Sequence, residues 1–422
     1  MSMNKSIKQI YVALEISEND LKILVAEYFN TRFNILRAEK TPTKAINNYK
    51  IVDKNILINE ITTLVNNASE KIGAKIEKVI LVLPSYNFKR ISLKSVVVPE
   101  EGYVKNSDIV RAISNSLKSK IDDGLMVYNA MPIKYTINGL STRRIPEKEV
   151  CNEMIVDIDL LCADKNVAFD YVSCVEECGI NVLDIVLNTY AIGKEASLFE
   201  ESLKQNLICL DINKTCTYMS LFSKGKLAST ELIFEGINTL ANDFKKQHNV
   251  PYEDLIKLLK FDVNYDCKYP DDIIYAYNKD SHTVTITTTE INNLCLNQLN
   301  AYTDNIITMC KPIIDEGALL FITGEGQQMN ALVEMLKSKA SCEVKSYYPD
   351  TIGVRDPSFT AIYGSLFAYK EKVLLNKISI SCIDLLSYDS YIDQKQLDAE
   401  GETITTKIKN LFKQYIEKED GE

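Results

Sequence analysis

Two stretches of the chain share one pattern of hydrophobic and polar positions. Residues 9–30 read as an aliphatic strand, an acidic residue, a short polar turn and a second aliphatic strand, and residues 207–222 repeat this order. Another short strand and then a helical segment follow each hairpin, at 33–39 and 53–73 after the first and at 229–234 and 236–248 after the second. This recurrence predicts two similar α/β lobes, the alternative being a chance likeness between two common hairpins.

A third pattern lies at residues 318–339, ALLFITGEGQQMNALVEMLKSK. It predicts a buried strand, a glycine turn and an amphipathic helix. Gly324 and Gly326 free the backbone where the strand gives way to the helix. A ligand can therefore lie against this turn and the N-terminus of the helix.

A compact module interrupts the first lobe after the predicted strand at 78–85. The hydrophobic pattern predicts a strand at 91–98, a helix at 106–121 and two further strands at 125–137 and 152–162. A helix is predicted next, at 169–178.

Composition narrows the class of protein. The 422 residues are too many for one ordinary core, and a net charge of −10 argues against a nucleic-acid partner, which would need a basic face. Eleven scattered cysteines and two histidines supply neither a zinc site nor a histidine-based triad. No signal peptide or run of about 20 apolar residues is visible, so we expect a cytosolic protein or one attached to a membrane from its cytosolic side.

In this order the motifs resemble the actin-like ATPase superfamily and, within it, the FtsA family of bacterial cell-division proteins. Besides the two hairpins and the glycine turn, the resemblance rests on residues 356–369, DPSFTAIYGSLFAY, which are similar to the closing helix, with Ala361 and Gly364 at its close-packing positions. The inserted module is similar to the 1C subdomain of FtsA. The resemblance implies an α/β, actin-like (RNase H-like) two-lobed fold with the FtsA-type 1C insertion in the first lobe.

The resemblance also implies a division of the chain into subdomains. The expected boundaries are 1–83 and 166–204 for the first lobe (1A), completed by 356–375; 84–165 for 1C; 205–245 and 306–355 for the second lobe (2A); 246–305 for 2B; 384–403 for a linker; and 404–418 for a membrane-targeting helix.

The hairpin turns depart from the family pattern, which has glycines there. Ser17-Glu18 and Asn213-Lys214-Thr215 stand in their place, so Cβ atoms and the charge of Glu18 lie where phosphates would approach. The nucleotide-binding candidates are Glu15, Ser17, Asp211, Lys214, Thr215, Gly236, Gly324 and Gly326. Either ATP binds through a remodelled phosphate grip, with Mg²⁺ held through waters by Glu15 and Asp211, or the pocket is vestigial. We expect no enzyme, at most a very weak ATPase, and name no catalytic or metal-ligating residue.

The C-terminal stretch predicts a membrane-binding element. After an acidic polar linker, apolar residues fall at helical spacing on one face and lysines on the other, which suits an anionic membrane surface. The residues are Ile404, Lys407, Ile408, Lys409, Leu411, Phe412, Lys413, Tyr415 and Ile416. The alternative is a terminal helix docked on the protein's own core. The acidic end, EKEDGE, predicts weak lipid binding that gains from self-association.

By resemblance, the protein tethers filaments of the tubulin-like protein FtsZ to the cytoplasmic membrane at the division site and self-associates. The FtsZ C-terminal peptide would bind the 2B subdomain, at Lys257, Lys260, Asn292, Asn293, Cys295 and Gln298. The alternatives are a PilM-like soluble actin-fold adaptor and an actin-fold ATPase or kinase. The kinase would need the glycine hairpin that this chain lacks.

Overall fold

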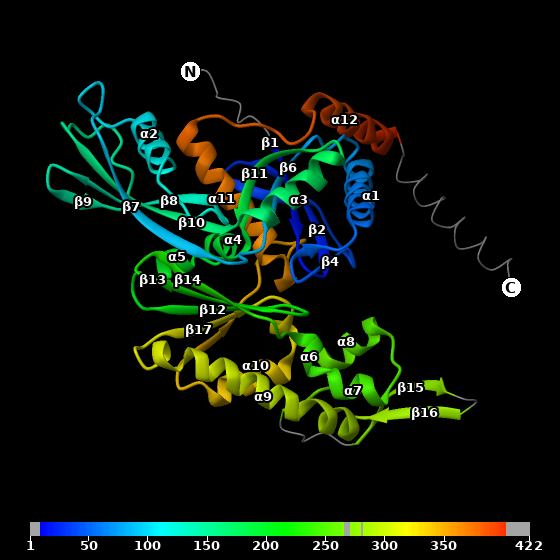
Figure 1. Cartoon of the computed structure of the whole chain (residues 1–422). Helices are drawn as coiled ribbons and strands as arrows, with labels where there is room; N and C mark the ends of the chain where they lie inside the picture. Colours follow the sequence, from blue (N-terminus) through cyan, green and yellow to red (C-terminus); the bar gives the residue numbers. More distant parts are fainter. Residues whose placement is uncertain (1–8, 266–270, 280–281, 402–422) are drawn as a thin grey trace.

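The structure, a computed structural model, describes residues 9–265, 271–279 and 282–401. Two five-stranded sheets form the centres of two lobes, one above the other in Figure 1. The sheet of the first lobe runs in the order β11 (Asn181–Leu187), β6 (Lys78–Leu83), β1 (Gln9–Ile16), β2 (Asp20–Phe29) and β3 (Arg32–Pro42). The sheet of the second lobe runs in the order β14 (Lys226–Ile233), β13 (Thr217–Ser223), β12 (Leu207–Ile212), β17 (Leu319–Thr323) and β18 (Val344–Ser346).

The two sheets have the same topology. In each, three antiparallel strands are followed by two strands parallel to the first: β1 pairs with β2 and runs parallel to β6, as β12 pairs with β13 and runs parallel to β17. The central strands β1 and β12 are buried along almost their whole length, as expected of strands covered on both faces. This common strand order confirms the prediction of two similar α/β lobes.

The helices of the first lobe form two packed groups. Helices α1 (Lys54–Ile72) and α3 (Lys165–Glu177) contact each other, and α4 (Asn188–Glu195) packs closely on α11 (Thr360–Asn376). A Cβ at Gly364 of α11 would overlap the backbone carbonyl of Ala191 in α4, so the predicted close packing at Gly364 is confirmed. The remaining short elements are β4 (Ile46–Asn47), β5 (Lys50–Ile51), α5 (Leu198–Glu201) and the 3₁₀ turn η2 (Pro357–Phe359).

The second lobe carries its helices around a separate hydrophobic core. The long helix α9 (Thr288–Ile314) runs under the sheet in Figure 1 and packs on α10 (Asn330–Lys339). The other elements are α6 (Ile237–Leu240), α7 (Asn242–Gln247), α8 (Tyr252–Phe261), the hairpin of β15 (Ile273–Lys279) and β16 (His282–Thr287), and the 3₁₀ turn η1 (Glu325–Gln328).

The inserted module is a four-stranded antiparallel sheet with one helix and its own core. Its strands lie in the order β7 (Lys89–Val97), β10 (Met154–Asp164), β8 (Leu125–Ile137) and β9 (Leu140–Thr142), beside helix α2 (Asn106–Ser116). The helix ends five residues before the predicted position. From this module Arg143 donates to the backbone carbonyl of Lys224, at 2.8 Å, in the β13–β14 turn of the second lobe.

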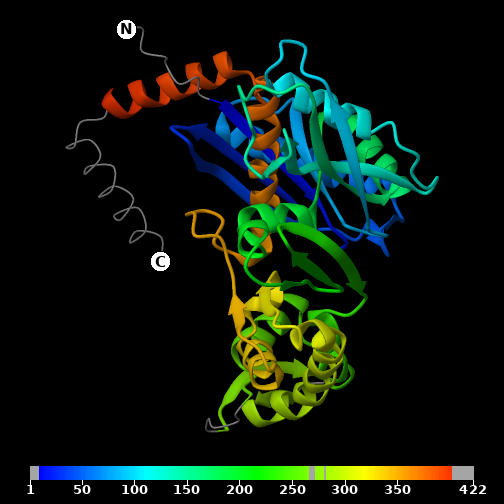
Figure 2. The ribbon, with the colours of Figure 1, turned by 90° about the vertical axis from the view of Figure 1, so that its left-hand side faces the viewer.

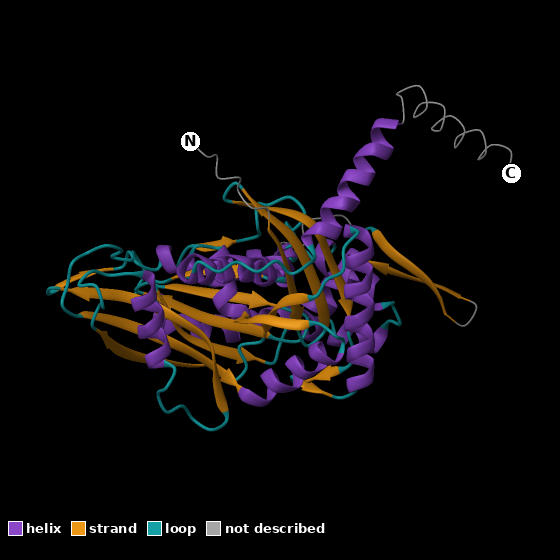
Figure 3. Cartoon of the chain, turned by 90° about the horizontal axis from the view of Figure 1, so that it is seen from above, coloured by secondary structure: helices purple, strands orange, loops and turns teal. Residues whose placement is uncertain are grey.

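The predicted linker is largely helical. Residues 385–401 form α12 (Leu385–Gly401), which extends from the first lobe in Figures 2 and 3. Leu385, Tyr388 and Ile392 fall at helical spacing and pack against the core of the first lobe. The sequence predicted a linker here without a helix, and a few well-spaced apolar side chains are enough to dock most of this segment as a helix.

The membrane-binding candidates, residues 404–416, lie outside the described residues. Within the described part of the chain, no helix has both the length and the apolar character needed to cross a membrane.

Candidate functional site

The turns of the two lobes' hairpins meet across the cleft between the lobes. In the first turn the Ser17 hydroxyl donates to the Asp20 carbonyl, at 2.8 Å. In the second, the Asn213 backbone N–H donates to the Cys216 carbonyl, at 2.9 Å. Thr215 Oγ1 reaches across and donates to Asn19 Oδ1, at 2.7 Å. The predicted hydroxyl donors Ser17 and Thr215 thus already have protein partners.

Glu18 does not point its charge toward a phosphate position. Its two carboxylate oxygens accept the backbone N–H groups of Asn48 and Tyr49, at 2.8 and 3.3 Å, in the β4–β5 turn. The sequence predicted that the Glu18 charge would lie near a bound phosphate chain, but two backbone amides bind this carboxylate instead.

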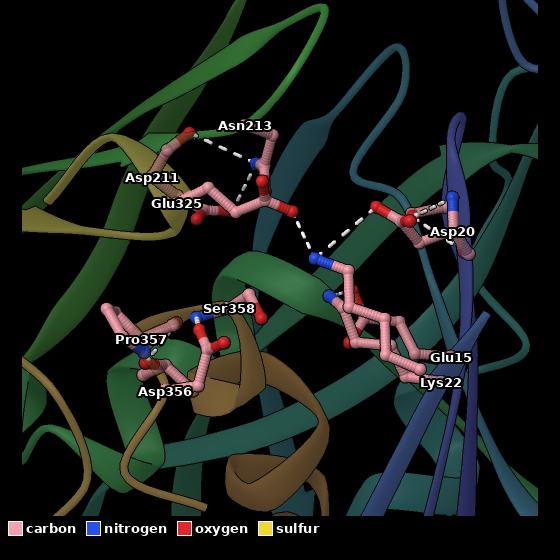
Figure 4. A network of polar contacts seen from close by, with 12 residues as sticks. Glu15, Asp20, Lys22, Asp211, Asn213, Glu325, Asp356, Pro357 and Ser358 are labelled. Carbon is pink, nitrogen blue, oxygen red and sulfur yellow. Dashed lines mark hydrogen bonds and ion pairs between the residues drawn. The ribbon is translucent and has the colours of Figure 1, made fainter. Parts of the chain in front are cut away.

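Two predicted carboxylates, Glu15 and Asp211, are buried on opposite sides of the cleft (Figure 4). Glu15 Oε1 accepts from Lys22 Nζ at 2.9 Å, while Glu15 Oε2 has no hydrogen-bond partner. Asp211 Oδ2 accepts from the Asn213 amide at 3.0 Å. Burial raises the pKa of the Asp211 carboxyl to about 6, against the opposing effects of the Asn213 hydrogen bond and the Lys22 charge.

Between the lobes, four side chains form what we call the interlobe square: Asp20 and Lys40 of the first lobe, and Lys214 and Glu325 of the second. Lys214 Nζ lies 2.7 Å from Asp20 Oδ1, and Lys40 pairs with Glu325. The two remaining sides are longer, 3.5 Å for Lys40–Asp20 and 3.9 Å for Lys214–Glu325. Figure 4 shows Asp20 and Glu325 facing each other from the two lobes.

The charges in the square stabilise one another. Burial alone would raise the pKa of the Glu325 carboxyl, but Lys40 and Lys214 more than offset it, so this pKa lies below its usual range. Each lobe contributes one cation and one anion, and both of the shorter pairs cross the cleft. The square therefore ties the lobes together.

The three candidate glycines have a packing role in this arrangement. A Cβ at Gly236 would overlap the backbone of Asn213, and one at Gly326 would overlap Ile212. Gly324 has a φ of +78°, and a Cβ there would lie 2.5 Å from Asp211 Oδ1. These positions are glycine because helix α6 and turn η1 approach the β12–β13 hairpin closely, whether or not a ligand binds there.

The space left between the hairpins is small. The cavity lined by Glu15, Ser17, Asp211 and Lys214 has a volume of about 30 Å³. A bound water occupies about that volume, whereas ligand pockets usually hold about 300–1,000 Å³. The unpartnered Glu15 Oε2 would also repel a phosphate. In this closed arrangement the residues of the cleft do not fit a nucleotide phosphate chain, and we derive no chemical step through one.

Within the described ranges, no group of three or more histidine, cysteine, aspartate or glutamate side chains is placed to hold a metal ion.

The predicted peptide-binding residues are not all on the surface. Asn292 and Cys295 are buried in helix α9. The amide oxygen of Asn292 accepts from the Asn264 backbone N–H, and its amide nitrogen donates to the Thr288 carbonyl. Lys260 turns toward the cleft and donates to Gln328, and Gln298 is half-buried. Lys257 and Asn293 are exposed. Burial thus excludes Asn292 and Cys295 from a peptide contact, because the spacing of α9 turns them to the core.

Sequence reasoning missed three members of the interlobe square: Asp20, Lys40 and Glu325. Glu325 was visible as a carboxylate between two glycines, where backbone freedom rather than charge was expected. Nothing in the local sequence marked Lys40 as a site residue, because its partner, Glu325, lies 285 positions away in the chain.

Comparisons with known proteins place these features in context. No family model matches the chain. It is 22% identical over 404 residues to the cell division protein FtsA of Staphylococcus epidermidis, covering 92% of this chain and 85% of that protein. It is 23% identical over 440 residues to FtsA of Enterococcus faecalis (96% and 98% covered) and 22% identical over 362 residues to FtsA of Bacillus subtilis (83% and 81%).

Solved structures resemble the fold. A chain of the PilM-PilN type IV pilus biogenesis complex superimposes with a TM-score of 0.57 and 13% identity, covering 84% of this chain and 97% of that one. MreB5 of Spiroplasma citri bound to ADP gives a TM-score of 0.51 at 12% identity, covering 87% and 98%. The same fold therefore accommodates nucleotide in another protein. With FtsA proteins similar over almost the whole length and actin-fold structures similar in architecture, the chain is a divergent relative of the cell-division protein FtsA, built on the actin fold.

Proposed function

We propose that this protein links FtsZ filaments to the cytoplasmic face of the membrane at the division site. It assembles with copies of itself and binds lipid through residues 404–418. The observation that carries the proposal is similarity to FtsA proteins that spans 92% of this chain and 85% of a relative, inserted module included. Weak binding of each copy to lipid is then enough for membrane attachment, because an assembly of copies binds through many such contacts at once.

In this proposal the protein works by binding and not by phosphoryl transfer. Phosphoryl transfer depends on accurate positioning of the phosphate and its nucleophile. Here the turn hydroxyls already have protein partners, and Glu15, whose Oε2 is unpaired, lines the same small cavity. The alternative of an actin-fold kinase gains no support from these contacts.

The proposed FtsZ-peptide surface is the outer side of α8 with the exposed part of α9. Lys257 and Phe261 lie four residues apart on α8 and so share one face of the helix. Phe261 is 70% exposed, an unusual position for a large apolar side chain. A cation beside an exposed aromatic ring suits an acidic peptide with an apolar anchor. Asn293 adds a polar contact from α9.

Binding of a fluorescent FtsZ tail peptide from the same organism tests this surface. Lys257→Glu should weaken the anisotropy-measured affinity by about tenfold or more, because it reverses the charge facing an acidic peptide. Lys246→Glu is the matched control: Lys246 is also an exposed lysine paired i,i+3 with an aspartate, but it lies on α7. Equal affinities for the two variants, or no binding by the unmodified chain, would contradict the peptide proposal.

A PilM-like adaptor without lipid binding remains the second candidate. It shares the fold and differs in what the C-terminal segment does. A lipid-binding measurement therefore separates the two.

A further inference from the structure

The cleft contains a buried anion, Glu325, that faces cations from both lobes. Glu325 begins turn η1, directly after Gly324, which follows the last residue of β17. Its carboxylate is 7% exposed and faces ammonium groups from both lobes, Lys40 and Lys214. Lys260 contributes a third positive charge that favours the ionised form.

We propose that the Glu325 carboxylate takes the place of a bound phosphate, so that the interlobe square holds the cleft closed without nucleotide. The phosphate chain of a nucleotide is a polyanion, and lysine ammonium groups facing a cleft are the side chains that would pair with one. Here Glu325 performs this task as part of the chain. It is always present, and the closed arrangement does not depend on nucleotide concentration.

The charge count supports this role. Two cations, Lys40 and Lys214, face two anions, Asp20 and Glu325, so the square is neutral as it stands. All four side chains are at least three-quarters buried, which makes an unpaired charge among them costly. Removing the Glu325 charge leaves two lysines against one carboxylate, with Lys260 nearby. The variant cleft then becomes a site for an added anion.

Hydrogen exchange of the full chain, followed by mass spectrometry, tests the proposal. Glu325→Gln keeps the shape of the side chain and removes its charge. Backbone amides in the segments 15–22 and 211–217 should exchange at least tenfold faster in this variant than in the unmodified chain. Lys40→Met should have a similar effect, and the double variant should be no worse than either single one, because both remove the same pair.

Acetate supplies the missing carboxylate in a second arm, on Glu325→Ala, which removes the four side-chain atoms beyond Cβ and so leaves room for it. Acetate should restore slow exchange in Glu325→Ala and leave the unmodified chain unchanged. Glu334→Gln is the matched control, since Glu334 pairs with Lys337 on the exposed face of α10, away from the cleft. Exchange in the β8–β10 sheet reports on folding in each variant.

Three results would overturn the proposal. The first is unchanged exchange in both Glu325→Gln and Lys40→Met. The second is equal faster exchange in Glu334→Gln. The third is protection of the unmodified chain by acetate to the same degree as Glu325→Ala. If Glu325→Gln fails to fold, Lys40→Met carries the test. None of these readouts involves peptide or lipid, so they are separate from the test of the proposed function.

Discussion

At the scale of single residues, the cleft contains ionisable side chains that are buried. Asp211 sits at the end of a fully buried strand, beside Glu15 and within reach of the Lys22 charge. Burial outweighs the favourable contacts and raises the pKa of Asp211 to about 6. The ionised carboxylate is therefore a liability for stability at neutral pH.

Asp211→Asn should stabilise the protein above pH 6. The folded pKa lies above the ordinary value of about 3.9, so the folded state binds more protons than the unfolded state between about pH 4 and 6. The free energy of unfolding contributed by Asp211 is then greatest at low pH and falls as pH rises through about 6. Substitution should raise the free energy of unfolding at pH 7.5 by about 2 kcal/mol and flatten this slope.

Urea unfolding at pH 5 and pH 7.5 measures this effect. Asp243→Asn is the control, because Asp243 is an exposed aspartate paired with Lys246. The control should keep the slope of the unmodified chain. A loss of stability on Asp211→Asn at pH 7.5 would show that the negative charge is needed in the fold.

Gly324→Ala should cost about 2–4 kcal/mol of unfolding free energy. An alanine there is strained by the left-handed backbone, and its Cβ would lie 2.5 Å from Asp211 Oδ1 and 2.7 Å from the Ile212 carbonyl. Gly317→Ala separates the two causes, since Gly317 has a φ of +91° but open space around it. It should cost about 1 kcal/mol. If Gly324→Ala and Gly317→Ala lose equal unfolding free energy in thermal or urea unfolding, the close approach of residue 324 to Asp211 has no effect on stability.

These residues also show what could be predicted from the sequence. Glu15, Asp211 and Lys214 were found because each follows or lies within a strand-turn pattern that local sequence reveals. Their partners could not be found in that way: Lys40 and Glu325 come together only when two lobes close on each other. The local pattern gave the positions of the candidate residues, and the tertiary contacts decide their role.

At the scale of elements, helices α4 and α11 of the first lobe pack closely on each other. Gly364 allows α11 to approach the backbone of Ala191 in α4. At the start of α11, Thr360 Oγ1 lies 2.9 Å from Thr323 Oγ1 at the end of β17. This pair therefore connects the first lobe directly to the central sheet of the second.

Gly364→Ala should lower the unfolding free energy by about 2–3 kcal/mol, although alanine is the better helix former. The added Cβ must push α4 away from α11 or shift the backbone. Calorimetric or urea unfolding checks this, with Ala368→Gly in the same helix as a contrasting change of opposite volume. A Gly364→Ala variant as stable as the unmodified chain would contradict the close packing.

Helix α12 shows why one element was missed. Its sequence is polar and acidic, with low mean hydropathy, which is typical of a linker. Burial of Tyr388 and the contact of Tyr391 with Gly73, at the end of α1, are enough to hold it. Few apolar side chains suffice when a preformed surface already exists, and sequence periodicity alone does not reveal that surface.

At the scale of the whole molecule, the two lobes share apolar contacts as well as polar ones, since Leu207, Phe222 and Phe321 of the second-lobe sheet pack in the hydrophobic core of the first lobe. The interlobe square ties the lobes at the cleft, and Arg143 ties the inserted module to the second lobe. The likeness of the two lobes followed from the repeated pattern in the sequence. The contacts between lobes did not, since they depend on surfaces that form only after each lobe folds.

The central claim is that the protein is a membrane tether, and sedimentation with vesicles tests it most directly. The full chain is compared with a chain ending at Gly401, which keeps α12 and removes the amphipathic segment. A Lys407→Glu/Lys409→Glu/Lys413→Glu variant and zwitterionic vesicles serve as controls. We predict that only the unmodified full chain pellets, and only with anionic vesicles. If the chain ending at Gly401 pellets equally, or if the full chain stays in solution at concentrations that support self-association, the tether account is contradicted.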